Sequence, residues 1–192
     1  KVSTNANLRN AATDTLRALL LCLKERADEA TLDEHVKNMT GSVLENIRTS
    51  SSAQMGGLVA LRLLAQIFPL TLRDAEYSAI CTAALDLSSS KNVLVRGEAF
   101  ELVAEMAGLD PQQFAETYLA RWTTMLIDLI TRREKERGMA IQALRHTIDA
   151  LGEHFSPSAG PVTLTLRQLL VAKGSGSLTL RRGSITEEDQ IV

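Results

Sequence analysis

The chain has 192 residues and a formal net charge of −2; 45% of its residues are hydrophobic and only 4% are aromatic. A charge so close to zero excludes an overall basic field for nucleic acid, so we expect no nucleic acid partner. The sequence has no uninterrupted apolar run of the roughly 18–20 residues that a membrane-spanning helix needs, so we expect no direct insertion into a membrane.

A pattern of one small residue followed by a helical stripe of Leu, Val, Met and Ala returns about every 40 residues. The small residues are Ala12, Gly57, Ala99 and Ala140. A period of this size with two helices per unit is typical of HEAT or armadillo solenoids, in which stacked helix pairs share one core. The sequence therefore predicts an all-α protein, an α-α superhelix of about four helical hairpins plus the start of a fifth.

The first hairpin is expected at residues 7–49 and the second at 53–88. In the first, helices are predicted from about 7 to 26 and from 32 to 49, with Thr31 as the N-cap of the second helix. Its first helix has a predicted inward stripe of Leu8, Ala12, Leu16, Leu19, Leu20 and Leu23. In the second hairpin, Pro69 is expected to stop the first helix, and the partner helix to run from about 72 to 87.

The third hairpin is expected at residues 92–132 and the fourth at 136–173. Asp110 and Pro111 have the residue types of an N-cap and a first helical residue. Gly152 is the predicted stop of the helix before it, and the last helix of the fourth hairpin is expected at about 159–172. The composition of residues 174–185 predicts a flexible loop, and residues 186–192 the start of a further helix.

The residues that carry most enzyme chemistry do not form recognisable motifs. His35, His146 and His154 are not spaced as metal ligands, and no phosphate-binding glycine loop or nucleophile elbow occurs. We therefore expect no catalytic residue, no metal site and no cofactor in this segment. Cys22 and Cys81 lie on apolar stripes and are expected to be buried, reduced thiols, which favours a cytoplasmic location.

Two features suggest contacts or regulation, each with a simpler alternative. Tyr118 and Trp122 form an aromatic pair that could anchor a protein partner, or could pack between repeats in the core. Ser184 follows Arg181 and Arg182, which is the acceptor pattern of basophilic kinases, although an ordinary linker has the same composition.

Three stretches resemble the N-terminal HEAT region of the target of rapamycin (TOR) serine/threonine protein kinases. They are SKNVLVR at 90–96, DPQQFA at 110–115 with Tyr118 and Leu119, and KERGMAIQAL at 135–144. Residues 11–18 and 54–64 are similar to earlier helices of that region, although the histidine of the family's "IHGSLLAL" helix is missing here.

The resemblance implies a scaffold segment of a large, dimeric kinase whose catalytic domain lies outside this chain. It implies protein partners, namely a raptor-like accessory subunit and other regions of the same kinase, in a complex at the lysosomal or vacuolar membrane surface. Polar capping repeats are not recognisable at either end of the chain, which also favours a segment of a longer protein.

Two other functions stay open on the sequence alone. One is a HEAT-repeat adaptor of another class, such as a transport receptor or a chromosome-associated scaffold, which a basic ridge or an acidic inner groove would favour. The other is a free-standing enzyme, which the missing motifs disfavour.

Overall fold

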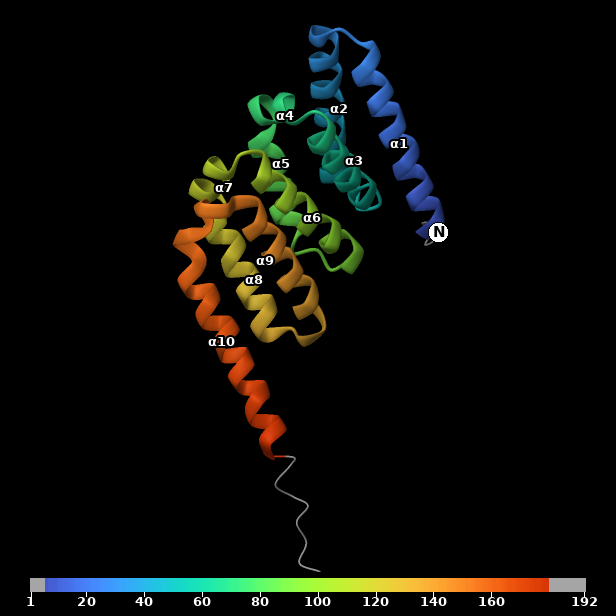
Figure 1. Ribbon diagram of the computed structural model, residues 1–192. Helices are drawn as coiled ribbons and strands as arrows, with labels where there is room; N and C mark the ends of the chain where they lie inside the picture. The colour runs from blue at the N-terminus through green and yellow to red at the C-terminus, as the bar shows by residue number, and fades with distance from the viewer. Residues whose placement is uncertain (1–5, 180–192) are drawn as a thin grey trace, which may run out of the picture.

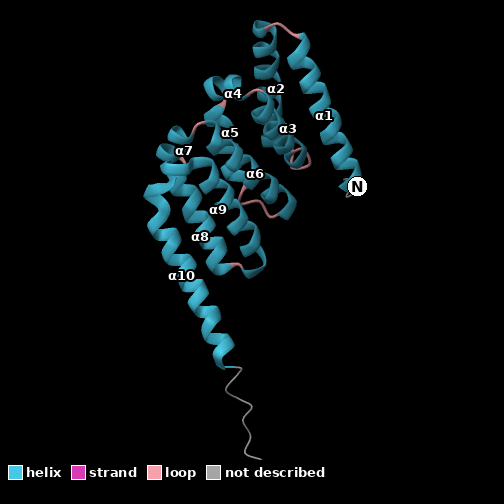
Figure 2. Cartoon of the chain, viewed as in Figure 1, coloured by secondary structure: helices cyan, strands magenta, loops and turns pink. Residues whose placement is uncertain are grey.

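The computed structural model describes residues 6–179, and for residues 6, 74–75 and 172–179 the backbone alone. Helices form all the regular structure of this part of the chain (Figure 1, Figure 2). Their bounds are α1 Ala6–Arg26, α2 Glu29–Thr49, α3 Gln54–Ile67, α4 Pro69–Ala75, α5 Tyr77–Leu87, α6 Val93–Leu109, α7 Pro111–Thr117, α8 Leu119–Arg132, α9 Arg137–Leu151 and α10 Ser156–Thr179, with short 3-10 turns η1 Glu134–Glu136 and η2 Gly152–Phe155. The predicted all-α fold is confirmed.

The helices stack in two rows, as in a helical-repeat superhelix. One row is α1, α3, α6 and α9, in which α3 with α6 and α6 with α9 make the most extensive contacts of the described residues. In the other row, α2 contacts α4 and α5, and α8 contacts α10. Figure 1 shows α1 and α10 at opposite ends of the stack.

The tightest pairs of consecutive helices are α2 with α3, α5 with α6, and α8 with α9. Each of these pairs joins the second helix of one predicted hairpin to the first helix of the next. Packing therefore groups the helices one step out of phase with the hairpins expected from sequence. The amphipathic period defines which face of a helix is apolar, but it does not define which neighbour covers that face.

Side chains cap several helix starts. The Asp110 carboxylate accepts a hydrogen bond from the Gln113 N–H at 2.9 Å, as expected, and Asn92 caps α6 in the same way. The expected N-cap Thr31 is wrong, because Asp28 takes this role: its Oδ1 accepts from the Thr31 N–H at 3.0 Å. The Thr31 hydroxyl donates to the other carboxylate oxygen of Asp28, and these two bonds hold the pKa of Asp28 below its usual value.

Two predicted long helices are interrupted, and one is longer than expected. Glu76 separates α4 from α5, and Tyr118 separates α7 from α8. Pro69 stops α3 and is also the first residue of α4. Residues 174–179, expected within the flexible loop, continue α10, because extending an existing helix costs less than starting a new one. Residues 180–192, with the rest of the loop and the expected fifth unit, lie outside the described residues.

The core lies between the two rows. On α6 the apolar residues at helical spacing are all buried: Val95, Ala99, Leu102, Val103 and Met106. On α1 the prediction is largely wrong, because Leu20 is the one buried residue of its described side chains, whereas Leu8 and Leu19 are 57% and 63% exposed. The reason is position, since α1 ends the stack and packs mainly on α3.

Among the described residues, no helix combines the length and the apolar character that crossing a bilayer requires.

Candidate functional site

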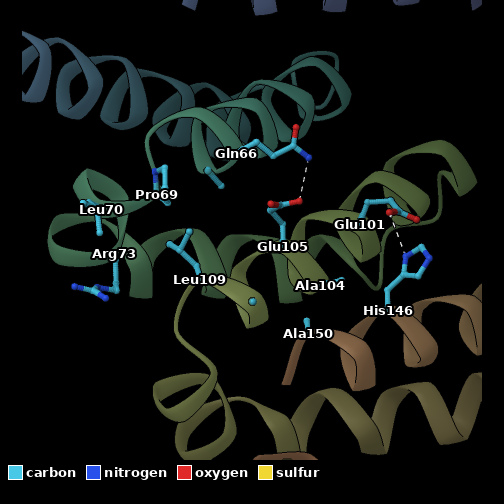
Figure 3. A pocket seen from close by; sticks show the side chains of 12 residues that line it. Gln66, Pro69, Leu70, Arg73, Glu101, Ala104, Glu105, Leu109, His146 and Ala150 are labelled. Atoms are coloured by element: carbon cyan, nitrogen blue, oxygen red, sulfur yellow. Dashed lines mark hydrogen bonds and ion pairs between the residues drawn. The ribbon is translucent and has the colours of Figure 1, made fainter. Parts of the chain in front are cut away.

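A groove of about 570 Å³ crosses three neighbouring segments of the stack. It lies between the end of α3 with the adjoining α4, the middle and end of α6, and α9 (Figure 3). The lining residues are Ala65, Gln66, Pro69, Leu70, Arg73, Glu101, Ala104, Glu105, Gly108, Leu109, His146 and Ala150. The groove is a consequence of stacking, because it forms only where helices from successive units lie beside one another.

Small residues line the groove where the helices approach each other. Ala65 and Ala104 are buried, and a Cβ atom added to Gly108 would lie 3.7 Å from the Cβ of Ala150. That distance is ordinary van der Waals contact, so a methyl group at position 108 would just fill the space between α6 and α9. Large side chains at these positions would occupy the hollow.

One side of the groove is polar and links α3, α6 and α9. The Gln66 amide donates a hydrogen bond of 3.0 Å to Glu105 Oε2, and its oxygen accepts one of 3.3 Å from Arg17 on α1. The Nδ1 atom of His146 lies 3.4 Å from Glu101 Oε2, an ion pair only when the imidazole is protonated. The side chains of Glu101 and His146 are 41% and 37% exposed, so the groove presents them to solvent.

The other end of the groove is mainly apolar. Pro69, Leu70 and Leu109 gather there, and Leu70 is 67% exposed. Arg73 also lines this end, and in Figure 3 its guanidinium points away from Glu101 and Glu105. The groove therefore offers two carboxylates at one end and an exposed aliphatic surface at the other.

The predicted partner anchor Trp122 does not lie on a surface. Its side chain is fully buried, its ring meets Phe100 edge-on at a centroid distance of 5.3 Å, and its Nε1–H donates to Thr147. Of the two interpretations that the sequence left open for Trp122, the structure supports core packing, because a ring enclosed between α6, α8 and α9 has no free face for a partner. Tyr118 is half-buried beside Phe114 and Tyr77, and its role as an anchor stays a prediction.

The remaining sequence-predicted residues do not meet in one site. His35 and His154 are exposed on separate elements, and only His146 reaches the groove. Ser184 lies outside the described residues, so its modification stays a prediction. Glu101 and Glu105 were not singled out as groove residues from the sequence. The one available signal is that Glu101 and His146 are 45 positions apart, about one repeat, so they occupy related places on successive helices.

The fold defines the class of this protein as an all-α helical-repeat superhelix. Comparison with models of known protein families, with curated protein sequences and with solved structures gives no match.

Proposed function

We propose that this chain is a non-catalytic scaffold segment that binds another protein along the α3, α6 and α9 row. The observation that carries the proposal is the groove itself, which combines the half-buried carboxylates of Glu101 and Glu105 with the exposed Leu70 across successive helices. Helical-repeat proteins use extended surfaces of this kind for partners, because each repeat adds another strip to a continuous face.

Contacts between neighbouring helices support a stiff surface. Arg62 of α3 lies 2.6 Å from Glu98 of α6, and Arg96 of α6 lies 2.9 Å from Glu136 of η1. Both pairs connect successive units, and the second is nearly enclosed. A surface held in this way is organised before the partner arrives, which lowers the entropy cost of binding.

The parent protein we propose is a TOR-type serine/threonine kinase acting in nutrient and growth signalling. This proposal rests on the resemblance of residues 90–96, 110–115 with 118–119, and 135–144, which fall at the start of α6, on α7 with the start of α8, and on η1 with α9. The partners would be a raptor-like accessory subunit and other regions of a dimeric kinase. The location would be the cytoplasm, with the complex at the lysosomal or vacuolar membrane surface.

A direct binding experiment tests the groove. The purified chain is immobilised and its affinity for a raptor-like subunit is measured by biolayer interferometry. Leu70→Asp combined with Glu105→Arg is expected to weaken binding at least tenfold. The matched control is Leu164→Asp combined with Asp14→Arg, two exposed positions on α10 and α1 outside the groove. Equal loss in both variants contradicts a groove-specific role, and no binding by the unaltered chain contradicts this partner.

The parent is tested by the open reading frame around these residues. A lipid-kinase-like catalytic domain toward the C-terminus is the expected result, and a complete reading frame without one contradicts the TOR-type parent.

A second candidate is a helical-repeat adaptor of another class, and the two groove carboxylates favour it. A transport receptor would use an acidic groove of this kind to bind a basic segment of its cargo protein. The reading frame again separates the two, because an adaptor would consist of helical repeats without a kinase domain.

A further inference from the structure

Both carboxylates of the groove stand on one helix, whereas Arg73 lines its other end. Glu101 and Glu105 are one turn apart on α6, so their side chains stand on the same face. Their partners across the groove are the neutral Gln66 amide and the His146 imidazole, which is charged only when protonated. With a neutral imidazole, two negative charges remain without a cation among these contacts.

The space beside these carboxylates fits a long cationic side chain. Residues three or four apart on a helix have Cβ atoms about 5–6 Å apart, so both carboxylates can approach one ammonium or guanidinium group. Small residues such as Ala104 and Ala150 leave the hollow open, and its volume of about 570 Å³ holds more than one side chain. The apolar stem of lysine or arginine can lie along the small residues while its charged end reaches the carboxylates.

We propose that the occupant is a segment of a partner protein with two recognition elements. A lysine or arginine side chain binds between Glu101 and Glu105, and a neighbouring aliphatic side chain packs on Leu70 and Leu109 (Figure 3). The inference rests on the proposed function of this groove in protein binding, and it adds the chemistry of the partner. The charged contact mainly determines which segment binds, because rim charges contribute more to specificity and association rate than to affinity. The aliphatic contact then supplies most of the affinity.

A phage-displayed library of random dodecapeptides, selected against the purified chain, tests this chemistry. We would sequence the peptides that bind the unaltered chain but do not bind its Leu70→Asp variant, because binding of these peptides depends on the groove. We expect lysine and arginine together to be enriched at least threefold over the starting library at one position, with an aliphatic residue close by.

Charge-neutral variants show whether the carboxylates cause this enrichment. The Glu101→Gln and Glu105→Gln double variant is expected to bind the selected peptides about three- to tenfold more weakly. The matched control, Asp14→Asn with Glu25→Gln, removes two exposed carboxylates from α1 and is expected to leave binding unchanged. Circular dichroism checks that both double variants keep the helical content of the unaltered chain.

The outcomes separate this inference from the proposed function. Groove-dependent peptides without lysine or arginine enrichment, or equal binding by the glutamine double variant, overturn the cationic partner and leave the groove as a binding surface. A selection that yields no groove-dependent peptide also overturns the inference, while the binding experiment with the accessory subunit still decides the proposed function. If the α1 control loses binding equally, the loss is caused by the change in net charge and not by the groove carboxylates, and the inference is overturned.

Discussion

The Nε1–H of Trp122 donates a hydrogen bond of 2.9 Å to the Oγ1 of Thr147, between α8 and α9. Both side chains are fully buried, and the Thr147 hydroxyl donates in turn to the Ala143 carbonyl at 2.9 Å. The hydrogen bond offsets the free-energy cost of removing the indole N–H from water, so the largest side chain of the core can be fully buried.

Thr147→Val keeps the shape of the side chain but leaves the indole N–H of Trp122 without its acceptor. We expect the free energy of unfolding to fall by about 1–3 kcal/mol, because a buried donor then has no partner. Urea unfolding followed by tryptophan fluorescence measures this change. Thr124→Val removes an exposed hydroxyl on α8 and serves as the control; equal midpoints for the two variants would contradict the role of the bond.

Gly57 on α3 and its neighbour Gly56 predict opposite effects of the same substitution. A Cβ atom at Gly57 would lie 2.5 Å from Cγ1 of Ile47 on α2, whereas one at Gly56 would meet no atom within 4 Å. We expect Gly57→Ala to destabilise the protein by about 1–3 kcal/mol through overpacking. Gly56→Ala is expected to stabilise it by up to about 1 kcal/mol, because alanine favours the helix.

Thermal unfolding of both alanine variants gives the comparison. Adding Ile47→Ala to Gly57→Ala is expected to relieve the overlap, so that the two changes together cost less than the sum of the single effects. A Gly57→Ala variant as stable as Gly56→Ala would show that α2 and α3 do not approach as closely as the structure has them.

The Arg96–Glu136 pair predicts strong coupling between two substitutions. The Arg96 guanidinium lies 2.9 Å from Glu136 and donates to the Ser90 carbonyl, with only 4% of the residue exposed. Glu136→Leu leaves this buried charge without its carboxylate, at an expected cost of about 3 kcal/mol. Arg96→Met is expected to cost less, because Glu136 keeps more contact with water and with Arg133.

The double variant Arg96→Met with Glu136→Leu should approach the stability of the unaltered protein. Arg96 Nε and Glu136 Oε2 have no hydrogen-bond partner among the described residues, so the charged pair is incompletely satisfied. An apolar pair avoids that desolvation. Denaturant unfolding of the four proteins gives the coupling energy, and additive single effects would show that the pair does not act as a unit.

Burial predicts that Cys81 is chemically silent while the protein is folded. Its enclosure raises the pKa of the thiol to about 12 from an ordinary value of 9.0, so the reactive thiolate is scarce at neutral pH. Cys22 on α1 is only half-buried, so the expectation that both thiols are buried is wrong for this one. Ellman's reagent at pH 8 is expected to modify Cys22 first and Cys81 only as fast as the protein opens. A Cys22→Ser variant that still reacts quickly would contradict this order.

The same shift gives the sign of a pH effect. The folded protein disfavours the Cys81 thiolate, so the contribution of this group is complete below pH 9 and is lost as the pH rises toward 12. A Cys81→Ala variant should therefore lose less stability between pH 8 and pH 10 than the unaltered protein does. Equal losses would show that the thiol does not contribute to the pH dependence.

Periodicity predicted the helices well where neighbours cover both sides, and poorly at the end of the stack. On α6 the stripe from Val95 to Met106 is buried, since α3, α5 and α9 surround it. The same reasoning failed for Leu8 and Leu19, because an apolar stripe cannot show whether a neighbouring helix is present to cover it. Similarly, Thr31 had the residue type of a cap, but Asp28 stands where the chain enters α2.

The groove could not be predicted from the sequence, because its residues come together only when the helices stack. Glu101 and His146 are 45 residues apart, and their contact follows from the stacking of α6 on α9. Trp122 was open to two interpretations on sequence, a partner anchor or core packing, and its burial supports the second. Composition could not separate these cases, because burial depends on which helices meet.

The close pairing of α2 with α3, α5 with α6, and α8 with α9 indicates where the chain can be shortened. Cutting at the ends of the repeats read from sequence would separate these pairs, which make the most extensive contacts between consecutive helices of the described residues. Cutting between Arg26 and Glu29, and again after Phe155, keeps three intact pairs and removes the two peripheral helices. The fragment that remains therefore begins with a helix that sequence periodicity assigns to the middle of a unit.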